Sequence, residues 1–261
     1  MKTRRAFIQA GAAALCGLAA APALATPRKI KEAGWTETFD VIVIGSGLAA
    51  FVAGLSALES GAKRVVLLEK MGMIGGSTAI SNGTISVPGS PLQQARGIED
   101  SPEAMLKDLL KAGKGFCHAE LTKTLVDNGV EAFEFIVKHG AKFKDTVMMP
   151  GGMTARRLLQ PDYNGATGLL APLRESYLKM GGRIILCCKA DRLLFSRGGR
   201  VEGVAARTDY HFNTQLKSDD LENKGGKPVR YRAKRGVICC TGGFEADRAF
   251  RSQELPQFEG A

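Results

Sequence analysis

The stretch FDVIVIGSGLAAFVAGLSALESGAKRVVLLEK, residues 39–70, decides the fold class of this 261-residue chain. A short strand is expected at positions 40–44, where Asp40 precedes four apolar residues. A Gly-rich turn follows, helical periodicity covers residues 48–60, and a second apolar run ends at Glu69. This order predicts a strand, a helix and a parallel strand. The chain is therefore expected to be an α/β protein built on a parallel sheet.

The glycines of this unit predict a binding site for the phosphates of a dinucleotide. Gly45 permits a tight turn, Gly47 lets the backbone approach a pyrophosphate, and Ala50 takes the third position of the G-x-G-x-x-G/A pattern. The helix that follows offers unpaired N–H groups and its positive dipole end, and Gly54 lets it lie close to the sheet. Glu69 comes 24 residues after Gly45, at the distance where a carboxylate accepts hydrogen bonds from ribose hydroxyls.

NAD and FAD share this pattern, so the next segment has to distinguish them. KMGMIGGSTAISNGTISVPGSPLQ, residues 70–93, contains Gly75, Gly76 and Gly83 with small hydroxyl residues between them, and little sign of a second regular helix. Small side chains and bare backbone suit a loop that wraps a large planar ligand and its phosphates. An ordinary surface loop is the alternative.

Three separated motifs resemble the flavoprotein family that includes soluble fumarate reductases, succinate dehydrogenase flavoprotein subunits and 3-ketosteroid dehydrogenases. They are IGSGLAAFVAGLSALESGAK, LLEKMGMIGGSTAISNGTISVPG and RAKRGVICCTGGFEAD, in that order. The resemblance implies FAD as the cofactor and a Rossmann-like FAD-binding domain. The residues that it implies to line the FAD are Gly45, Ser46, Gly47, Leu48, Ala49, Glu69, Lys70, Gly76, Ser77, Thr78, Gly83, Thr84, Ala190, Thr241 and Gly242. Among them, Ala190 is implied to contact the adenine through its backbone.

The rest of the chain predicts a helical insertion and a β-meander. SPEAMLKDLLKAGKG and LTKTLVDNGVEAFEFIVKHG have the spacing of two helices, with Ser101 as an N-cap and Gly140 after the second helix. The resemblance implies a Gly-rich turn at residues 164–168 that leads into a further helix. RIILCCKADRLLF and RVEGVAART predict adjacent strands that turn at residues 197–199, and YRAKRGVICC predicts a last strand that returns to the parallel sheet.

Several chemically suggestive residues have plainer interpretations. Arg156 and Arg157 are expected to be exposed loop cations rather than contacts to an acidic substrate. His139 is expected to lie at a helix end rather than to act as a catalyst. His118 and His211 show no ligand spacing, so no metal site is predicted.

The charge distribution and the cysteine content argue against a nucleic-acid-binding protein and against a disulfide-rich or metal-binding protein. The net charge is +10, but the basic residues are dispersed, and the cluster within residues 224–235 alternates as on one solvated strand edge, so nucleic-acid binding is not expected. Five cysteines follow residue 25. Their odd number and the two vicinal pairs predict core packing rather than disulfides or a metal site. They are Cys117, Cys187, Cys188, Cys239 and Cys240.

The N-terminal sequence MKTRRAFIQAGAAALCGLAAAPALA, residues 1–25, predicts a removable twin-arginine (Tat) export signal around Arg4 and Arg5. A membrane anchor is disfavoured because the apolar run is interrupted by Pro22 and falls short of the roughly 20 residues that a span requires. Residues 26–38 are expected to be a linker and residues 39–261 the FAD-binding domain. The protein is therefore expected in the periplasm, with no membrane span after signal removal.

The predicted chemistry is hydride transfer between the flavin and an activated alkene such as an unsaturated carboxylate. Members of the family that reduce fumarate tend to show His-Arg-Pro-Thr-Gly-Gly where this chain has LQPDYNG at 159–165, which weakens an assignment to fumarate. The family's proton-delivering arginine and capping domain are expected after Gly243, so no catalytic residue is assigned. The expected electron-transfer partner is a separate cytochrome c or quinone-linked protein.

Two alternatives to a fumarate-reductase-like subunit or fragment remain open. One is a non-catalytic flavin-binding remnant of a split gene. The other is a desaturase like the ketosteroid dehydrogenases, because the STAISNG block followed by Pro88 is similar to theirs. The substrate would then be a steroid-like enone.

Overall fold

The computed structural model describes residues 34–216, 218–243 and 252–256, and everything below concerns the unit formed by residues 35–261. The predicted signal peptide and most of the predicted linker lie outside the described residues. In the part of the chain that is described, no helix is long and apolar enough to cross a membrane.

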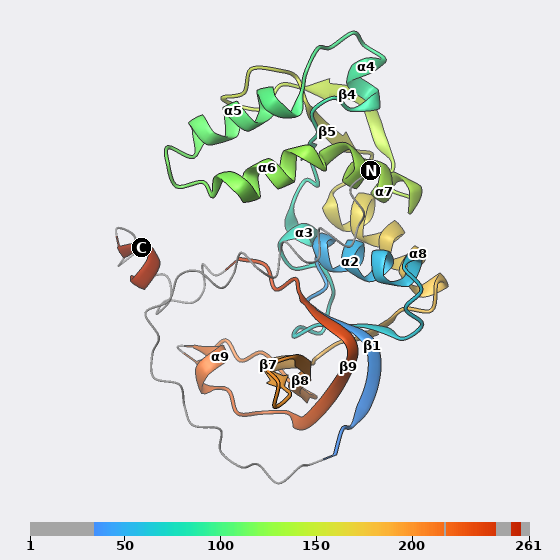
Figure 1. Ribbon diagram of the computed structural model, residues 1–261, viewed down its shortest axis with the longest axis vertical. Coiled ribbons are helices and arrows are strands. Elements are labelled where there is room, and N and C mark those ends of the chain that lie inside the picture. Colours follow the sequence, from blue (N-terminus) through green and yellow to red (C-terminus); the bar gives the residue numbers. More distant parts are fainter. Residues whose placement is uncertain (1–33, 217, 244–251, 257–261) are drawn as a thin grey trace. The chain divides into compact units, whose positions relative to one another are not determined.

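The predicted βαβ unit is confirmed (Figure 1). Strand β1 covers Glu37–Ile44 and begins three residues earlier than expected, helix α2 covers Leu48–Glu59, and strand β2 covers Val65–Leu68. β1 and β2 pair in parallel, with Val41 opposite Val65. The four residues of β2 are all buried, because both faces of this sheet are covered.

The main sheet has the strand order β6-β2-β1-β9-β8-β7. One of its faces packs against α2, the π-helical turn η2 (Gly165–Leu170) and α8 (Ala171–Lys179), around Phe51, Leu169 and Tyr177. A second buried cluster, on the other side of β1 and β2, contains Ile42 and Val66. This order confirms a mostly parallel α/β sheet that is extended by an antiparallel meander.

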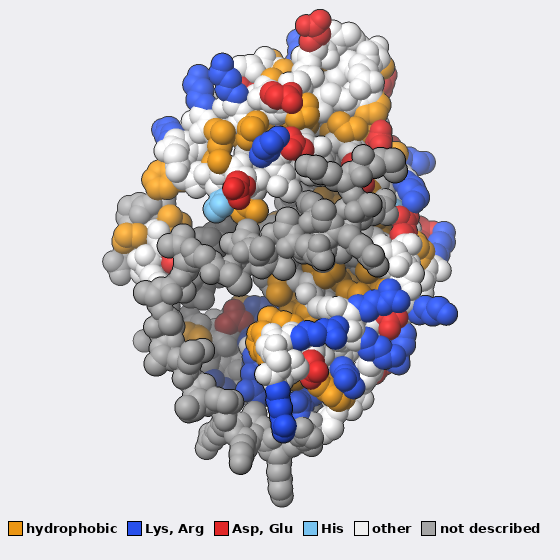
Figure 2. Space-filling model, viewed as in Figure 1, with side chains coloured by type: hydrophobic (Ala, Val, Ile, Leu, Met, Phe, Trp, Pro, Cys, Tyr) orange, Lys and Arg blue, Asp and Glu red, His pale blue; other side chains and the backbone are white. Residues whose placement is uncertain are grey.

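The last strand, β9 (Lys227–Cys239), returns to the parallel sheet as predicted and pairs with β1 from Glu37 to Ile44. It pairs antiparallel with β8 on its other side. The expectation that its basic residues follow a strand edge is therefore wrong, because β9 lies between two strands. Its exposed Arg232 and Lys234 flank the buried Ala233, so the charges share one face of an interior strand. Figure 2 shows the Lys and Arg side chains in view interspersed with acids.

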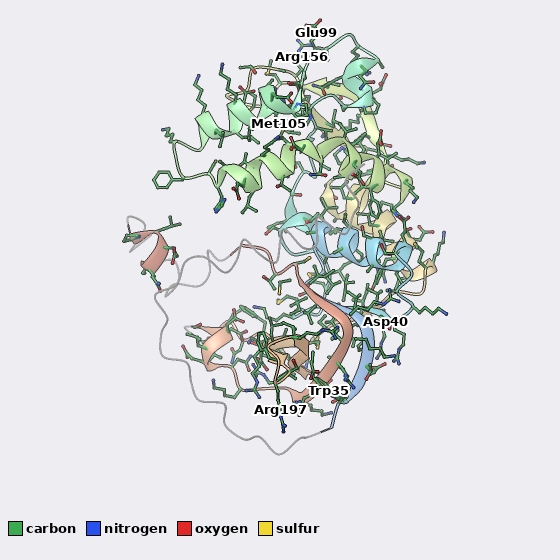
Figure 3. All side chains as sticks on the ribbon, viewed as in Figure 1. Trp35, Asp40, Glu99, Met105, Arg156 and Arg197 are labelled. Carbon is green, nitrogen blue, oxygen red and sulfur yellow. The ribbon has the colours of Figure 1, made fainter. Side chains whose placement is uncertain are left out.

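The meander contains β6 (Arg183–Ile185), β7 (Lys189–Phe195) and β8 (Val201–Thr208). RIILCCKADRLLF is not one strand as predicted, because β6 pairs with β2 whereas β7 pairs with β8. Cys187, between them, has a φ of +50°, which breaks the extended backbone. The predicted turn at residues 197–199 is confirmed, and Figure 3 labels Arg197 within it.

The cysteines divide between core and surface. Cys188 is 1% exposed, as core packing predicts. Cys239 is exposed, so core packing is wrong for this residue, which lies at the last position of β9. Free thiols are found at all five cysteines of the described residues.

The insertion between α3 and η2 is more divided than predicted. After α3 (Gly76–Ile80), it contains helices α4 (Pro91–Gln94), α5 (Pro102–Ala112), α6 (Ala119–Asp127) and α7 (Gly129–Lys138). The second expected helix is two helices, which meet at Asn128. The short strands β3 (Ile85–Ser86), β4 (Phe143–Met148) and β5 (Leu158–Pro161) form a small sheet that the periodicity did not predict.

Ser101 caps the start of α5, as predicted, and His139 lies at the end of α7, as predicted. The Ser101 hydroxyl accepts a hydrogen bond from the Ala104 N–H at 3.2 Å, and Pro102 takes the first helical position. His139 follows the last residue of α7 and is buried, with Nδ1 2.6 Å from the Ser176 hydroxyl and Nε2 3.1 Å from Glu59. It therefore links α7 to α8 and α2.

Arg157 is the largest departure from expectation. Arg156 is exposed, and Figure 3 labels it beside Glu99 in the insertion, but Arg157 is 0% exposed. Its guanidinium donates to Asp100 at 2.7 and 2.8 Å and to Asp108 at 2.6 Å. The prediction of an exposed loop cation is wrong for Arg157, because two carboxylates of the insertion compensate the buried charge.

Candidate functional site

The turn after β1 is held against the end of β9. Gly45 has a φ of +110°, and its N–H donates to the Leu68 carbonyl at 2.8 Å. A Cβ atom on Gly45 would lie 2.2 Å from the carbonyl oxygen of Cys240, so the position accepts glycine alone. The first predicted motif and the Thr241–Gly242 turn of the last one therefore meet.

The buried Ser46 connects the first motif to the end of β2 and to the loop before α3. Ser46 is 1% exposed, and its hydroxyl donates to Glu69 Oε2 at 2.5 Å and accepts from the Gly75 N–H at 3.0 Å. The other carboxylate oxygen of Glu69 accepts from the Met71 N–H at 2.7 Å. Glu69 is thereby fixed at the carboxyl end of β2, where ligands bind in open α/β sheets.

Two helix N-termini begin beside each other at this point. Gly47 is the N-cap of α2, and the Leu48 N–H donates to the Thr78 hydroxyl of α3 at 3.1 Å. Among the described residues, no hydrogen bond engages the N–H groups of Gly47, Ala49 and Gly76. Unpaired N–H groups at helix starts are the donors that phosphates accept from.

The start of η2 contacts the segment that follows α3. The Gly165 N–H donates to the Ser81 carbonyl at 3.0 Å, and a Cβ on Gly165 would lie 2.1 Å from the Thr78 carbonyl oxygen. Gly83 has a φ of +74° and faces Gly165, where its own Cβ would lie 2.9 Å from the α-carbon. The Asn164 side chain caps η2 by accepting from the Thr167 N–H. The expected helical segment is therefore present, but it begins at Gly165, within the residues that were expected to form the turn before it.

The residues predicted to lie near adenosine converge on Glu69. The Cys188 N–H donates to the Glu69 carbonyl at 2.8 Å, which places the start of β7, and so Ala190, near the end of β2. Lys70 Nζ lies 3.2 Å from the Asp220 carboxylate. Ser77, Thr84, Thr241 and Gly242 are exposed.

Most residues predicted to bind the cofactor thus gather at the carboxyl ends of β1, β2 and β9. The arrangement fits a dinucleotide: glycines keep the backbone accessible, free N–H groups suit the pyrophosphate, and Glu69 suits ribose hydroxyls. No group of three or more metal-ligating side chains occurs within the described ranges.

Gly75 belongs to this site, although it is not among the residues predicted to line the FAD. Its φ is +119°, and a Cβ there would lie 2.6 Å from Leu170 Cδ1 and 2.7 Å from Ala79 Cβ. Its N–H is the donor that reaches Ser46. The Gly-Gly pair at 75–76 was a visible signal, but only the tertiary contacts distinguish the roles of its two members.

Comparisons with known proteins match this chain to flavin-dependent proteins. The FAD binding domain family model matches residues 40–259. The chain is 34% identical over 97% of its length to the acrylate reductase flavoprotein subunit of Shewanella woodyi and covers 48% of that protein.

Two solved structures share the fold. A Rhodococcus jostii 3-ketosteroid-delta4-(5alpha)-dehydrogenase in complex with 4-androstene-3,17-dione superposes with a TM-score of 0.72 at 26% identity, covering 88% of this chain and 51% of that one. The open conformation of a flavocytochrome c3 fumarate reductase gives 0.74 at 23% identity, covering 100% and 40%.

The chain thus spans about half the length of the curated relative and of the steroid enzyme that it matches. The family model covers most of the chain and all the motifs that build the site, and it indicates FAD as the cofactor. This chain belongs to the FAD binding domain family.

Proposed function

We propose that this chain provides the FAD-binding part of a reductase that adds hydrogen across the carbon–carbon double bond of a small unsaturated carboxylate. The observation that carries the proposal is the 34% identity to the acrylate reductase flavoprotein subunit, which extends over 97% of this chain. The site adds physical support, because its donors and its carboxylate are arranged for an adenine dinucleotide.

Each part of the site has a proposed role. The free N–H groups of Gly47, Ala49 and Gly76, at the starts of α2 and α3, bind the pyrophosphate. Glu69 accepts hydrogen bonds from the ribose, and Ser46 holds its carboxylate in place. When bound, FAD supplies the hydride chemistry at its ring system. Thr241 and Gly242 are exposed, and their proposed role is a backbone contact with the cofactor.

Proton delivery and substrate binding are assigned to polypeptide homologous to the other half of the relatives. The reaction requires an acid near one alkene carbon and cationic groups for the carboxylate. Arg157 is not one of these groups, because its guanidinium is buried between Asp100 and Asp108. No residue of this chain is therefore assigned a catalytic role.

The proposed cellular location rests on the N-terminal sequence, and the proposed electron donor rests on that location. The twin-arginine motif at Arg4 and Arg5 supports Tat export to the periplasm, a route that carries folded, cofactor-loaded proteins. The proposed electron donor is a cytochrome c or a quinone-linked protein on a separate chain.

A ketosteroid-type desaturase is the second candidate. It is favoured by the TM-score of 0.72 and the 26% identity to the 3-ketosteroid-delta4-(5alpha)-dehydrogenase. In that case hydride would leave a steroid-like enone rather than reach an unsaturated carboxylate. A non-catalytic flavin-binding module is the remaining alternative.

The experiment is a purification followed by paired assays. The chain is expressed together with a polypeptide homologous to the half of the relatives that it does not cover, and flavin content is measured by absorbance after removal of free flavin. Reduced methyl viologen is then supplied with acrylate or fumarate, and an artificial acceptor is supplied with 4-androstene-3,17-dione. Oxidation of the dye by acrylate supports the proposal. Steroid turnover alone favours the desaturase, and bound FAD without turnover of any substrate overturns both enzyme proposals.

A further inference from the structure

The connection between β8 and β9 is far longer than the strands require. The two strands pair antiparallel up to Thr208 opposite Lys227, so a turn of about two residues would join them. The chain instead places residues 209–226 between them. Connections longer than about 12–15 residues within a compact domain are uncommon and are usually functional.

Buried hydrogen bonds hold this connection in one conformation. Tyr210 is 1% exposed and Asp219 7%, and the Tyr210 hydroxyl donates to the Asp219 carboxylate. Asp219 Oδ1 also accepts from the Asn213 N–H at 2.8 Å and from the Asn223 amide at 2.7 Å. Residues 210–213 and 218–223 are therefore fixed around one carboxylate. We call these two stretches the clasp.

The clasp contacts both sides of the predicted adenosine site. Its Asp220 carboxylate lies 3.2 Å from Lys70 Nζ, at the end of β2, and 3.9 Å from Lys189 Nζ, one residue before Ala190. The Tyr210 N–H donates to the Cys187 carbonyl at 2.9 Å. Lys70 and Ala190 are 120 residues apart in sequence, and one side chain of the clasp bridges their neighbourhoods.

An aromatic ring accompanies the ion pair. Lys70 Nζ lies 5.4 Å from the centre of the Phe212 ring, so the ammonium group contacts both a carboxylate and an aromatic ring. Phe212 is 45% exposed, although it belongs to a segment with a buried anchor. A flat, accessible ring beside the residue that follows Glu69 is suited to pack against a nucleobase.

We propose that the clasp binds the adenosine end of FAD, with Asp220 as a positioning residue that orients Lys70 and with Phe212 as a wall for the adenine. The inference rests on FAD binding at Glu69. The proposal predicts ligand selectivity: the clasp raises the affinity for ligands that carry an adenosine diphosphate group and does not change the affinity for FMN, which lacks one.

The test uses flavin-depleted full-length protein and three ligands: FAD, FMN and ADP. Dissociation constants for FAD and FMN come from flavin fluorescence, and those for ADP from calorimetry. Asp220→Asn is expected to weaken FAD and ADP binding about 3- to 5-fold, the upper part of the range for a partly exposed charge pair. FMN binding is expected to remain within about 2-fold of wild type. Phe212→Ala is expected to show the same ligand pattern.

The matched control is Asp209→Asn. Asp209 belongs to the same connection and pairs with Lys227 at 2.9 Å, but both side chains are more than half exposed and neither contacts Lys70. This variant should bind all three ligands like wild type, and Asp220→Glu should recover most of the affinity for FAD and ADP. Far-UV circular dichroism of the depleted variants checks the fold.

The outcomes distinguish a failure of the clasp hypothesis from a failure of FAD binding at Glu69. If wild-type protein binds FAD but both clasp variants bind FAD and ADP as tightly as wild type, the clasp is overturned and the cofactor site stands. Equal weakening of FAD and FMN also overturns it, because adenosine would then not be the group contacted. If wild-type protein binds neither FAD nor ADP, the failure lies in the cofactor site itself.

Discussion

Gly45 and Cys240 are in direct backbone contact, although 195 residues separate them in the sequence: a Cβ on Gly45 would come within 2.2 Å of the Cys240 carbonyl oxygen. The contact closes the site, because it joins the phosphate-binding turn to the strand end from which Thr241 and Gly242 extend.

Gly45→Ala should therefore destabilise the protein more than a glycine substitution at a positive φ with no steric clash. The φ of +110° and the clash with backbone atoms together predict a loss of about 3 kcal/mol or more in the free energy of unfolding, and loss of bound FAD. Gly61→Ala is the control. Gly61 has a φ of +83°, but a Cβ added there would meet no atom within 4 Å, so about 1–2 kcal/mol is expected. Urea unfolding measures both, and equal losses would refute a role for the contact.

Ser46→Ala tests the hydrogen bonds that hold Glu69. The change leaves the buried Gly75 N–H without an acceptor, which should cost about 1–3 kcal/mol, and it frees one side of the Glu69 carboxylate. FAD affinity should fall with stability. The exposed Ser60 at the other end of the α2 segment provides the control variant Ser60→Ala, for which stability and affinity should both stay near wild type. Unchanged FAD affinity in Ser46→Ala would show that Glu69 does not depend on this bond.

Arg157→Met tests the buried ion network of the insertion. Removal of the guanidinium leaves Asp100 and Asp108 buried without their counter-charge, and breaking such a network costs about 3–5 kcal/mol. Its exposed neighbour gives the matched variant Arg156→Met, which is expected to change stability by less than about 0.5 kcal/mol. Chemical unfolding of both variants measures the difference. Similar values for the two would mean that the network contributes little.

Asp108 should give the insertion a measurable dependence on pH. The Thr154 backbone N–H, the Thr154 hydroxyl and the Arg157 guanidinium lower the pKa of Asp108 below 3.8, against the opposing effect of burial. A lowered pKa in the folded state stabilises the protein above about pH 4, and that stability is lost as the pH falls through the folded-state pKa. The stability gap between wild type and Asp108→Asn should therefore narrow as the pH falls below about 4. A gap independent of pH would contradict this assignment.

The thiols should differ sharply in reactivity. Burial raises the pKa of Cys188 to about 12, so only about one molecule in 10⁴ carries a thiolate there at pH 8. Cys239 is exposed. Iodoacetamide at pH 8 should label Cys239 within minutes and leave Cys188 unlabelled until the protein unfolds, as mass spectrometry of peptides would show. Prompt labelling of Cys188 in folded protein would contradict its burial.

Local pattern was sufficient for the βαβ unit and for the return of the last strand. Short continuous apolar runs, a glycine turn and a helical repeat are short-range signals, and the burial of β2 on both faces bears them out. The break at Cys187 and the division at Asn128 escaped prediction, because each depends on which distant element the flanking residues pack against.

By itself, the sequence determined the fold class and the dinucleotide-binding motif, because glycine spacing and hydrophobic periodicity act within a few residues. The choice of FAD came from the resemblance to a flavoprotein family. Only the tertiary structure decided that Arg157 is buried, that Ser46 joins Glu69 to Gly75, and that Asp220 reaches Lys70. These are contacts between segments 23 to 150 residues apart, and the neighbours of a charge or hydroxyl at that distance are set by packing rather than by local pattern.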